Sequence, residues 1–277
     1  MILIQDTKFN PARETAFFAL LKTMGEVSPW PVTELEFRDL WLKNIAAGGT
    51  VIADGWYNPP PRGAAVLFGE KNNPGRISFS SLREKKFRPK SKNALDWKSG
   101  FIYAYCSPVH RDTGIIGDIS ICLYLGGDRR LRDHFIKAHA ATAELLGRLS
   151  QASNSRQLFE LSQSVFAEYD LTNIPASITD PLNNNIGHTF PSLGPLRAKA
   201  LTREQKKYIS GARQFINGGD PFEFTDGMQF TIEPQLWSAI DPTLPKVTFH
   251  YLAQKVPGGF RLCRDTDILS AKYGLTR

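Results

Sequence analysis

The sequence predicts an α+β fold in which helices pack on a largely antiparallel sheet. Two helical patterns open the chain, and a series of short β-like runs follows between about residues 50 and 125. A long helical pattern begins after Asp128, and further β-like runs lie near the end of the chain. Helices and strands grouped in blocks, rather than in strict alternation, are typical of α+β domains.

Two amphipathic helices are expected at the start of the chain. In the first, Asn10 is the N-cap, Pro11 lies in the first turn and Gly25 follows the last turn. An Asn side chain accepts hydrogen bonds from free helical amides, and glycine tolerates the positive φ common after a helix end. In the second helix, Thr33 and Glu36 have the spacing of a capping box.

Short runs of β-branched and aromatic residues, separated by Pro, Gly and Asn, predict strands. The first group comprises 50–55, 64–69, 76–81, 101–107 and 117–127, and the last comprises 226–234, 246–254 and 260–263. Between the two groups, Asp128 caps a long helix and a shorter helix follows it. Thr202 and Gln205 indicate one more capped helix.

Length and composition are those of an ordinary globular protein. The 277 residues are 42% hydrophobic and 22% charged, and we expect a single domain over 1–277. Without a signal-peptide pattern or an apolar run of about 20 residues, the expectation is a cytoplasmic protein with no membrane partner. The three cysteines lie far apart without a CxxC pair, which favours buried free thiols over disulfides or a zinc ribbon.

The formal charge of +7 is concentrated in one segment. Residues 83–92 hold six basic residues and one acid, a net +5, which leaves +2 for the rest of the chain. A solvated loop is the ordinary interpretation, and a surface for an acidic or phosphate-bearing partner, carried by Lys85, Lys86 and Arg88, is the alternative. Because the basicity is local, nucleic acid is not a predicted partner.

Glu233 stands in an apolar, strand-like run, "GMQFTIEPQLW", directly before a proline. A buried carboxylate must be paired, hydrogen-bonded or bound to a metal. Its partner could be an arginine such as Arg261 or Arg264. His188 follows a glycine in the irregular segment 172–200, and loops of that length in compact domains often carry function.

Four segments resemble motifs of one family. "GMQFTIEP" is similar to the glycine-methionine, acid and proline run of the pita-bread family of M24-like peptidases, which includes methionine aminopeptidases, prolidases, proline-specific aminopeptidases and creatinase. "IGHTF" resembles its histidine ligand segment, "GDIS" its second aspartate strand and "PVTELEF" the entry to its second helix. The segments lie in the family's order within residues 12–270. The resemblance implies a curved, mostly antiparallel sheet with helices packed on one face.

The resemblance also implies a metal site held by two aspartates, a histidine and two glutamates. Matched residue by residue, Asp118 corresponds to the second aspartate, His188 to the histidine and Glu233 to the first glutamate. Carboxylates and a neutral imidazole suit one divalent transition metal, namely Fe, Mn, Zn or Co. The alternative interpretation makes Asp118 a cap or ion-pair residue and His188 a satisfied loop histidine.

Several family positions hold other residues in this chain. Cys106 or Ser107 replaces the first aspartate, and Phe249 or His250 replaces the last glutamate. Phe68 takes the place of one substrate-side histidine, and "HTFPSLGP" lacks the other. The losses imply a mononuclear site with open coordination positions and a pocket bordered by Phe68 and Phe249.

The candidate further ligands are His250, Cys106, Ser107 and, more distantly, His110. His250 and His110 are also the candidate proton shuttles. The function that follows is a metallohydrolase-like enzyme acting on a small amino-acid- or peptide-like substrate, with chemistry that need not be peptidase chemistry. The alternative is a non-catalytic module that has lost its metal and holds a peptide or an acidic partner. A second copy of the chain, forming a homodimer, is kept as a candidate partner.

Residues 199–220 form an expected helical insertion between the histidine and the glutamate. It is interpreted either as a lid over the cleft or as a surface decoration.

Overall fold

The computed structural model describes residues 2–5, 9–57, 63–70, 74–77, 81–175 and 179–276. The chain divides into two compact units. Unit 1 comprises Met1–Thr7, Gly127–Phe190 and Arg213–Arg277, and unit 2 comprises Lys8–Gly126 and Pro191–Ala212. None of the helices in the described ranges has the length and apolar character that a membrane span requires.

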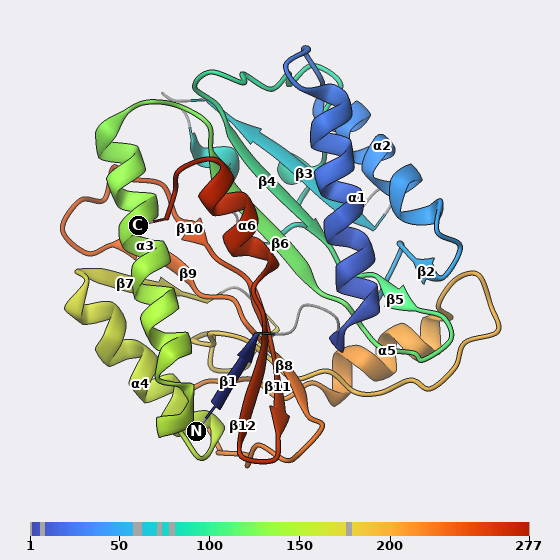
Figure 1. Cartoon of the computed structure of the whole chain (residues 1–277), viewed down its shortest axis with the longest axis vertical. Coiled ribbons are helices and arrows are strands. Elements are labelled where there is room, and N and C mark those ends of the chain that lie inside the picture. The colour runs from blue at the N-terminus through green and yellow to red at the C-terminus, as the bar shows by residue number, and fades with distance from the viewer. Residues whose placement is uncertain are drawn as a thin grey trace. The chain divides into compact units, whose positions relative to one another are not determined.

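The core of unit 2 is an antiparallel sheet of three strands (Figure 1). Its order is β3 (Ala64–Gly69), β4 (Phe101–Cys106) and β6 (Ile119–Tyr124), and every residue of these strands is buried. β2 (Val51–Ile52) and β5 (Val109–His110) form a separate antiparallel ribbon. The strand predicted at 76–81 is wrong where described: Pro74–Ile77 is a 3-10 turn, and residues 78–80 lie outside the described part of the chain.

α1 (Pro11–Val27) and α2 (Glu34–Ala46) pack on each other, α1 contacting β6 and α2 contacting β3. The capping box of Thr33 and Glu36 is confirmed. The end predicted for α1 at Gly25 is wrong. The helix continues until the amide of Ser28 bonds to the carbonyl of Met24, and Pro29, which has no amide hydrogen, follows.

α5 (Arg203–Ala212) is the helix predicted within the insertion, and it belongs to unit 2. The Thr202 hydroxyl accepts from the amide of Gln205 at 3.2 Å, while the Gln205 side chain accepts from the amide of Thr202 at 2.9 Å. Lys206 forms an ion pair with Asp54 of the same unit at 3.5 Å. The capping prediction is confirmed, and the lid remains a prediction.

Residues 83–92, the basic loop, are anchored by a buried carboxylate. Glu34, fully buried at the start of α2, pairs with the guanidinium of Arg76 at 2.8 Å. The carboxylate also accepts from the amide of Lys90, which lies in the basic loop. Its remaining donors are the amide of Phe68 and the side chain of Asn93. Because these donors come from three parts of the chain, Glu34 ties α2 to β3, to the turn that holds Arg76 and to the basic loop.

The described residues of unit 1 form two sheets and three α-helices (Figure 1). One sheet has the order β1 (Ile2–Gln5), β12 (Gly259–Cys263), β11 (Tyr251–Val256) and β8 (Gln229–Ile232). The other has the order β10 (Val247–Thr248), β9 (Gln235–Ser238) and β7 (Leu171–Ile174). The helices are α3 (Arg129–Gly147), α4 (Ser155–Glu168) and α6 (Asp265–Lys272). Among the described strands, β1 and β12 pair in parallel and all other pairs are antiparallel, as predicted.

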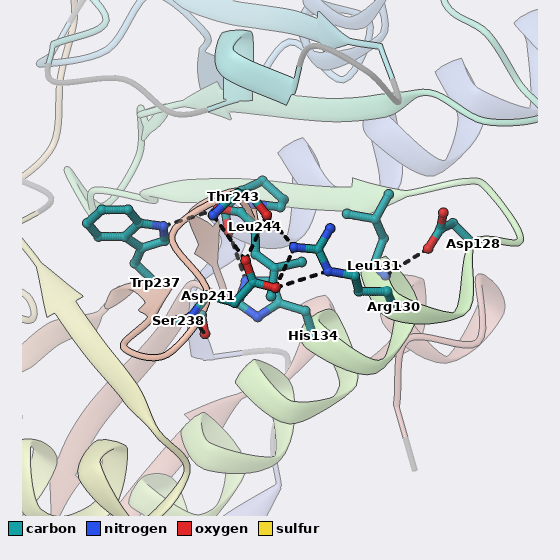
Figure 2. Close-up of polar contacts among 10 residues, drawn as sticks. Asp128, Arg130, Leu131, His134, Trp237, Ser238, Asp241, Thr243 and Leu244 are labelled. Carbon is teal, nitrogen blue, oxygen red and sulfur yellow. Dashed lines mark hydrogen bonds and ion pairs between the residues drawn. The ribbon is translucent and has the colours of Figure 1, made fainter.

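The loop after β9 is fixed to the first turns of α3, as Figure 2 shows. The Arg130 guanidinium donates to the carboxylate of Asp241 and to the hydroxyl of Thr243. One turn further along α3, Nε2 of the buried His134 lies 2.8 Å from the carbonyl oxygen of Pro245. Since this carbonyl only accepts, the imidazole donates through Nε2.

The stabilising effect of the hydrogen bonds between Arg130 and Asp241 is expected to appear in the pH dependence of stability. Hydrogen bonds from Arg130 and then Thr243 lower the pKa of Asp241 from 3.8 to about 2. A lowered folded-state pKa gives stability that is complete above the ordinary pKa and is lost as the pH falls toward the folded value. In urea unfolding between pH 4 and pH 2, Asp241→Asn should therefore lose less stability than the wild type. Asp133→Asn, an exposed control on α3, should lose as much stability between pH 4 and pH 2 as the wild type. An equal loss in Asp241→Asn would contradict a stabilising role for the hydrogen bonds between Arg130 and Asp241.

Candidate metal centre

Three polar side chains meet in the interior of unit 1. Nε2 of His188 lies 3.4 Å from Oε1 of Glu233, and Nε2 of His250 lies 3.5 Å from Oε2 of the same carboxylate. The residues are 2%, 8% and 0% exposed for His188, Glu233 and His250. The hydroxyl of Thr231 lies 3.1 Å from Oε1 of Glu233 and donates to it. Each carboxylate oxygen of Glu233 thus faces an imidazole nitrogen, while Arg264 pairs with Asp267.

The pairing of β8 with β11 explains why His250 faces Glu233. Ile232 and Tyr251 are partners in the antiparallel ladder, so the next positions along are Glu233 and His250. Pro234 follows and has no amide hydrogen to continue the ladder. Of the two candidates for the last glutamate position, His250 is therefore the one at the site, while the ring of Phe249 packs against His139 at 5.2 Å.

A segment lying beside β8 positions His188. The amide of Thr231 bonds to the carbonyl of His188, and the amide of Glu233 bonds to the carbonyl of Ile186, each at 2.8 Å. A Cβ atom on Gly187 would lie 2.0 Å from the carbonyl oxygen of Thr231. Only glycine allows this close approach, so the Gly-His dipeptide of the sequence has a structural cause.

The hydrogen bonds of His188 determine its protonation. Its Nδ1 lies 3.1 Å from the carbonyl oxygen of Thr189, which can only accept, so Nδ1 carries the proton. Burial, and then the charge of Arg213, hold the pKa of His188 well below its usual value, so the ring is neutral. Its Nε2 lone pair then faces the lone pairs of Glu233 Oε1. Two acceptors at this distance repel unless a proton or a metal ion lies between them, and the arrangement of the two atoms suits a metal ion.

Asp118, Cys106 and Ser107 belong to unit 2. Asp118 is buried immediately before β6, and Cys106 at the end of β4 pairs with Ile119. Burial, and then the charge of Asp118, raise the pKa of the Cys106 thiol well above its usual value, so the thiol is protonated. The hydroxyl of Ser107 accepts from the amide of Tyr57 at 3.1 Å. Neither residue therefore restores the anionic oxygen of the missing aspartate.

Two further predicted site residues lie in unit 2. Nδ1 of His110, on β5, is 3.0 Å from the hydroxyl of Thr113, and the residue borders an open depression with Phe18 of α1 and Asn44 of α2. Phe68 is buried in β3 against Phe37, with ring centroids 5.9 Å apart. The roles predicted for them at a substrate stay predictions.

Thr231 is a site residue that the sequence interpretation missed. It donates to Glu233 and also accepts from the amide of His188 at 3.0 Å, so a single hydroxyl fixes both. Its signal in the sequence was its spacing, because residues two apart in a strand point to the same face.

No protein-family model and no curated protein matches the sequence. Solved structures do match. X-Pro aminopeptidase from Thermotoga maritima aligns with a TM-score of 0.59 at 12% identity, over 91% of this chain and 58% of that one. Prolidase from Pyrococcus furiosus aligns with a TM-score of 0.58 at 14% identity, and the alignment covers 91% of this chain and 61% of the prolidase. Methionine aminopeptidase from Rickettsia prowazekii aligns with a TM-score of 0.55 at 14% identity, and the alignment covers 92% of this chain and 94% of the aminopeptidase. The chain thus spans about three fifths of the first two proteins, and at these identities the likeness shows a common fold.

Proposed function

We propose that this chain, which has the pita-bread fold, is a metal-dependent enzyme acting on a small amino-acid- or peptide-like substrate. The observation that carries the proposal is the lone pair of His188 Nε2, held 3.4 Å from a carboxylate oxygen of Glu233. The ligands proposed for one divalent Fe, Mn, Zn or Co ion are Asp118, His188 and Glu233, with His250 as the further ligand. The named activities of the similar structures make a peptide-like substrate the natural first class to test.

The side chains around the proposed ligands support the same function. The carbonyl of Thr189 holds the proton on His188 Nδ1, so that Nε2 presents its lone pair toward Glu233. The hydroxyl of Thr231 orients Glu233, and the hydroxyl of Thr266 donates to the carbonyl of His250 at 2.9 Å. When bound, the metal would activate a water molecule or polarise a carbonyl group.

The proposed reaction differs from that of an ordinary aminopeptidase. His250 stands where the family resemblance implies a glutamate, and Cys106 or Ser107 where it implies an aspartate, so the site has fewer anionic oxygens to hold two ions. A single ion with an imidazole-rich ligand set leaves open positions for substrate and suits another C–N cleavage, an elimination or an oxygen-dependent step.

A substrate panel tests the function. Protein loaded with Mn²⁺, Fe²⁺, Co²⁺ or Zn²⁺ is incubated with Xaa-Pro and Met-Xaa peptides, and with amino-acid amides and N-substituted amino acids. We expect metal-dependent turnover in the second group, abolished in Glu233→Gln. Rapid release from the two peptide types would contradict a changed reaction, and no metal-dependent turnover in either group would count against an enzyme.

The basic loop favours a second candidate function, a binding module for an acidic peptide. All six of its basic side chains are exposed: Arg83, Lys85, Lys86, Arg88, Lys90 and Lys92. Glu34 holds the backbone beneath them through Arg76 and the amide of Lys90, so the charges are presented on a fixed loop. Preorganised charge of one sign attracts a partner of the opposite sign.

Salt dependence tests this second candidate. Binding of a fluorescent poly-glutamate peptide should weaken at least about 10-fold between 50 mM and 200 mM salt, because exposed charges are screened. Neutralising Lys85, Lys86 and Arg88 together to Ala should reduce the low-salt affinity by a similar factor. The matched control neutralises three exposed cations elsewhere in unit 2: Lys199, Arg203 and Lys207. Equal affinities for both triple variants, or no salt effect, would exclude the role.

A further inference from the structure

Arg13 is a fully buried arginine in the first turn of α1. A guanidinium stays protonated at any physiological pH, and burying its charge is costly unless anions or hydrogen-bond acceptors surround it. The buried charge therefore needs a cause in its surroundings.

Within unit 2, the side chain of Arg13 contacts the main chain at Asp118. Nη1 of Arg13 donates to the main-chain carbonyl of Asp118. Next to it, the Asn10 side chain donates to the carbonyl of Ile116 at 2.9 Å, and a Cβ on Gly117 would lie 2.4 Å from the amide nitrogen of Arg13. The start of α1 is thus held directly against residues 116–118, which fixes the guanidinium beside the aspartate.

Cys106 lies close to Asp118 in the sheet. It is fully buried at the end of β4 and pairs with Ile119, the residue after Asp118. Cys106 and Ser107 carry a thiol and a hydroxyl in place of a carboxylate, and the hydroxyl of Ser107 accepts from the amide of Tyr57 at 3.1 Å. The anionic charge on this side of unit 2 is thus carried by Asp118, and a fixed cation already accompanies it.

We propose that the guanidinium of Arg13 supplies the positive charge beside Asp118 that a second divalent ion would otherwise supply, which limits the site to one ion. This inference rests on the proposed function for the first ion. A permanently charged, buried guanidinium repels a second dication, and a thiol and a hydroxyl offer that dication no carboxylate.

The number of Mn²⁺ ions bound tests the inference. Equilibrium dialysis of the full chain at millimolar Mn²⁺ compares the wild type with Arg13→Met, which keeps the bulk but loses the charge, and with Arg13→Lys, which keeps the charge. Arg13→Met is expected to bind one more equivalent than the wild type, and Arg13→Lys the same number as the wild type. An unchanged number in a folded Arg13→Met overturns the inference. A wild type that binds no Mn²⁺ contradicts the proposed function. The role of Arg13 is decided separately, by the difference in bound Mn²⁺ equivalents between Arg13→Met and the wild type.

A second measurement applies if Arg13→Met does not fold. Urea unfolding of wild type and Asp118→Asn is compared in the presence of a chelator, where no metal can contribute. If Arg13 is the resident counter-charge, Asp118→Asn leaves it uncompensated and lowers the unfolding midpoint. If metal ions alone balance Asp118, removing the carboxylate charge leaves the midpoint unchanged or raises it, and the inference fails.

Discussion

Replacing Glu233 with glutamine is expected to weaken metal binding by at least about 100-fold. Loss of a residue that only supports a ligand commonly costs 10- to 100-fold in affinity, so loss of a charged ligand should cost more. Glutamine keeps the shape but not the negative charge, and it leaves the two imidazoles of His188 and His250 without the carboxylate that each faces.

Titration calorimetry with Mn²⁺ or Co²⁺ measures this effect directly. Glu168→Gln, which removes a charge from an exposed position at the end of α4 in the same unit, is the matched control and should bind like the wild type. An affinity for Glu233→Gln within threefold of the wild type would mean that the carboxylate serves the fold and not a metal.

Replacing Glu34 with alanine is expected to destabilise unit 2 by about 3–5 kcal/mol, the usual cost of breaking a buried ion pair. The variant would leave the guanidinium of Arg76 without its carboxylate and the amides of Phe68 and Lys90 without their acceptor. The position of Glu34 in the first turn of α2 adds a favourable interaction with the helix dipole that alanine also loses.

Denaturant unfolding at neutral pH measures the loss. Glu84→Ala provides the control, because Glu84 is a partly exposed residue of the basic loop that pairs with Lys86 at 3.0 Å. Such surface pairs contribute little. A loss below about 1 kcal/mol for Glu34→Ala would contradict the anchoring role, since a buried pair should cost several times more. Faster proteolysis within residues 83–92 should accompany a genuine loss.

Local chemistry made much of the fold predictable. The caps at Asn10, Thr33 and Asp128 start the helices where expected, because each side chain satisfies a free helical amide. Ends were harder to predict. Gly25 permitted a helix stop but did not require one, and α1 ends only when Pro29 follows Ser28. α6 (Asp265–Lys272) was missed because its eight residues are too few to show a helical period.

The sequence predicted those candidate site residues that stand in a recognisable motif. His188 and Glu233 were found by their motifs, and Gly187 has a steric reason to precede the histidine. The choice between Phe249 and His250 needed the register of β8 with β11, because a shift of one residue in a strand reverses which side chain faces the site. Arg13 could not be singled out, since nothing in a helical pattern separates a buried arginine from an exposed one.

Metal analysis of the purified wild-type protein after mild dialysis, with His188→Ala in parallel, tests the central claim most directly. The account predicts a single equivalent of a transition metal in the wild type and none in the variant, because Nε2 of His188 faces Glu233 as a neutral ligand. Wild-type protein that holds no metal, even after reconstitution with Fe²⁺, Mn²⁺, Co²⁺ or Zn²⁺, would contradict it.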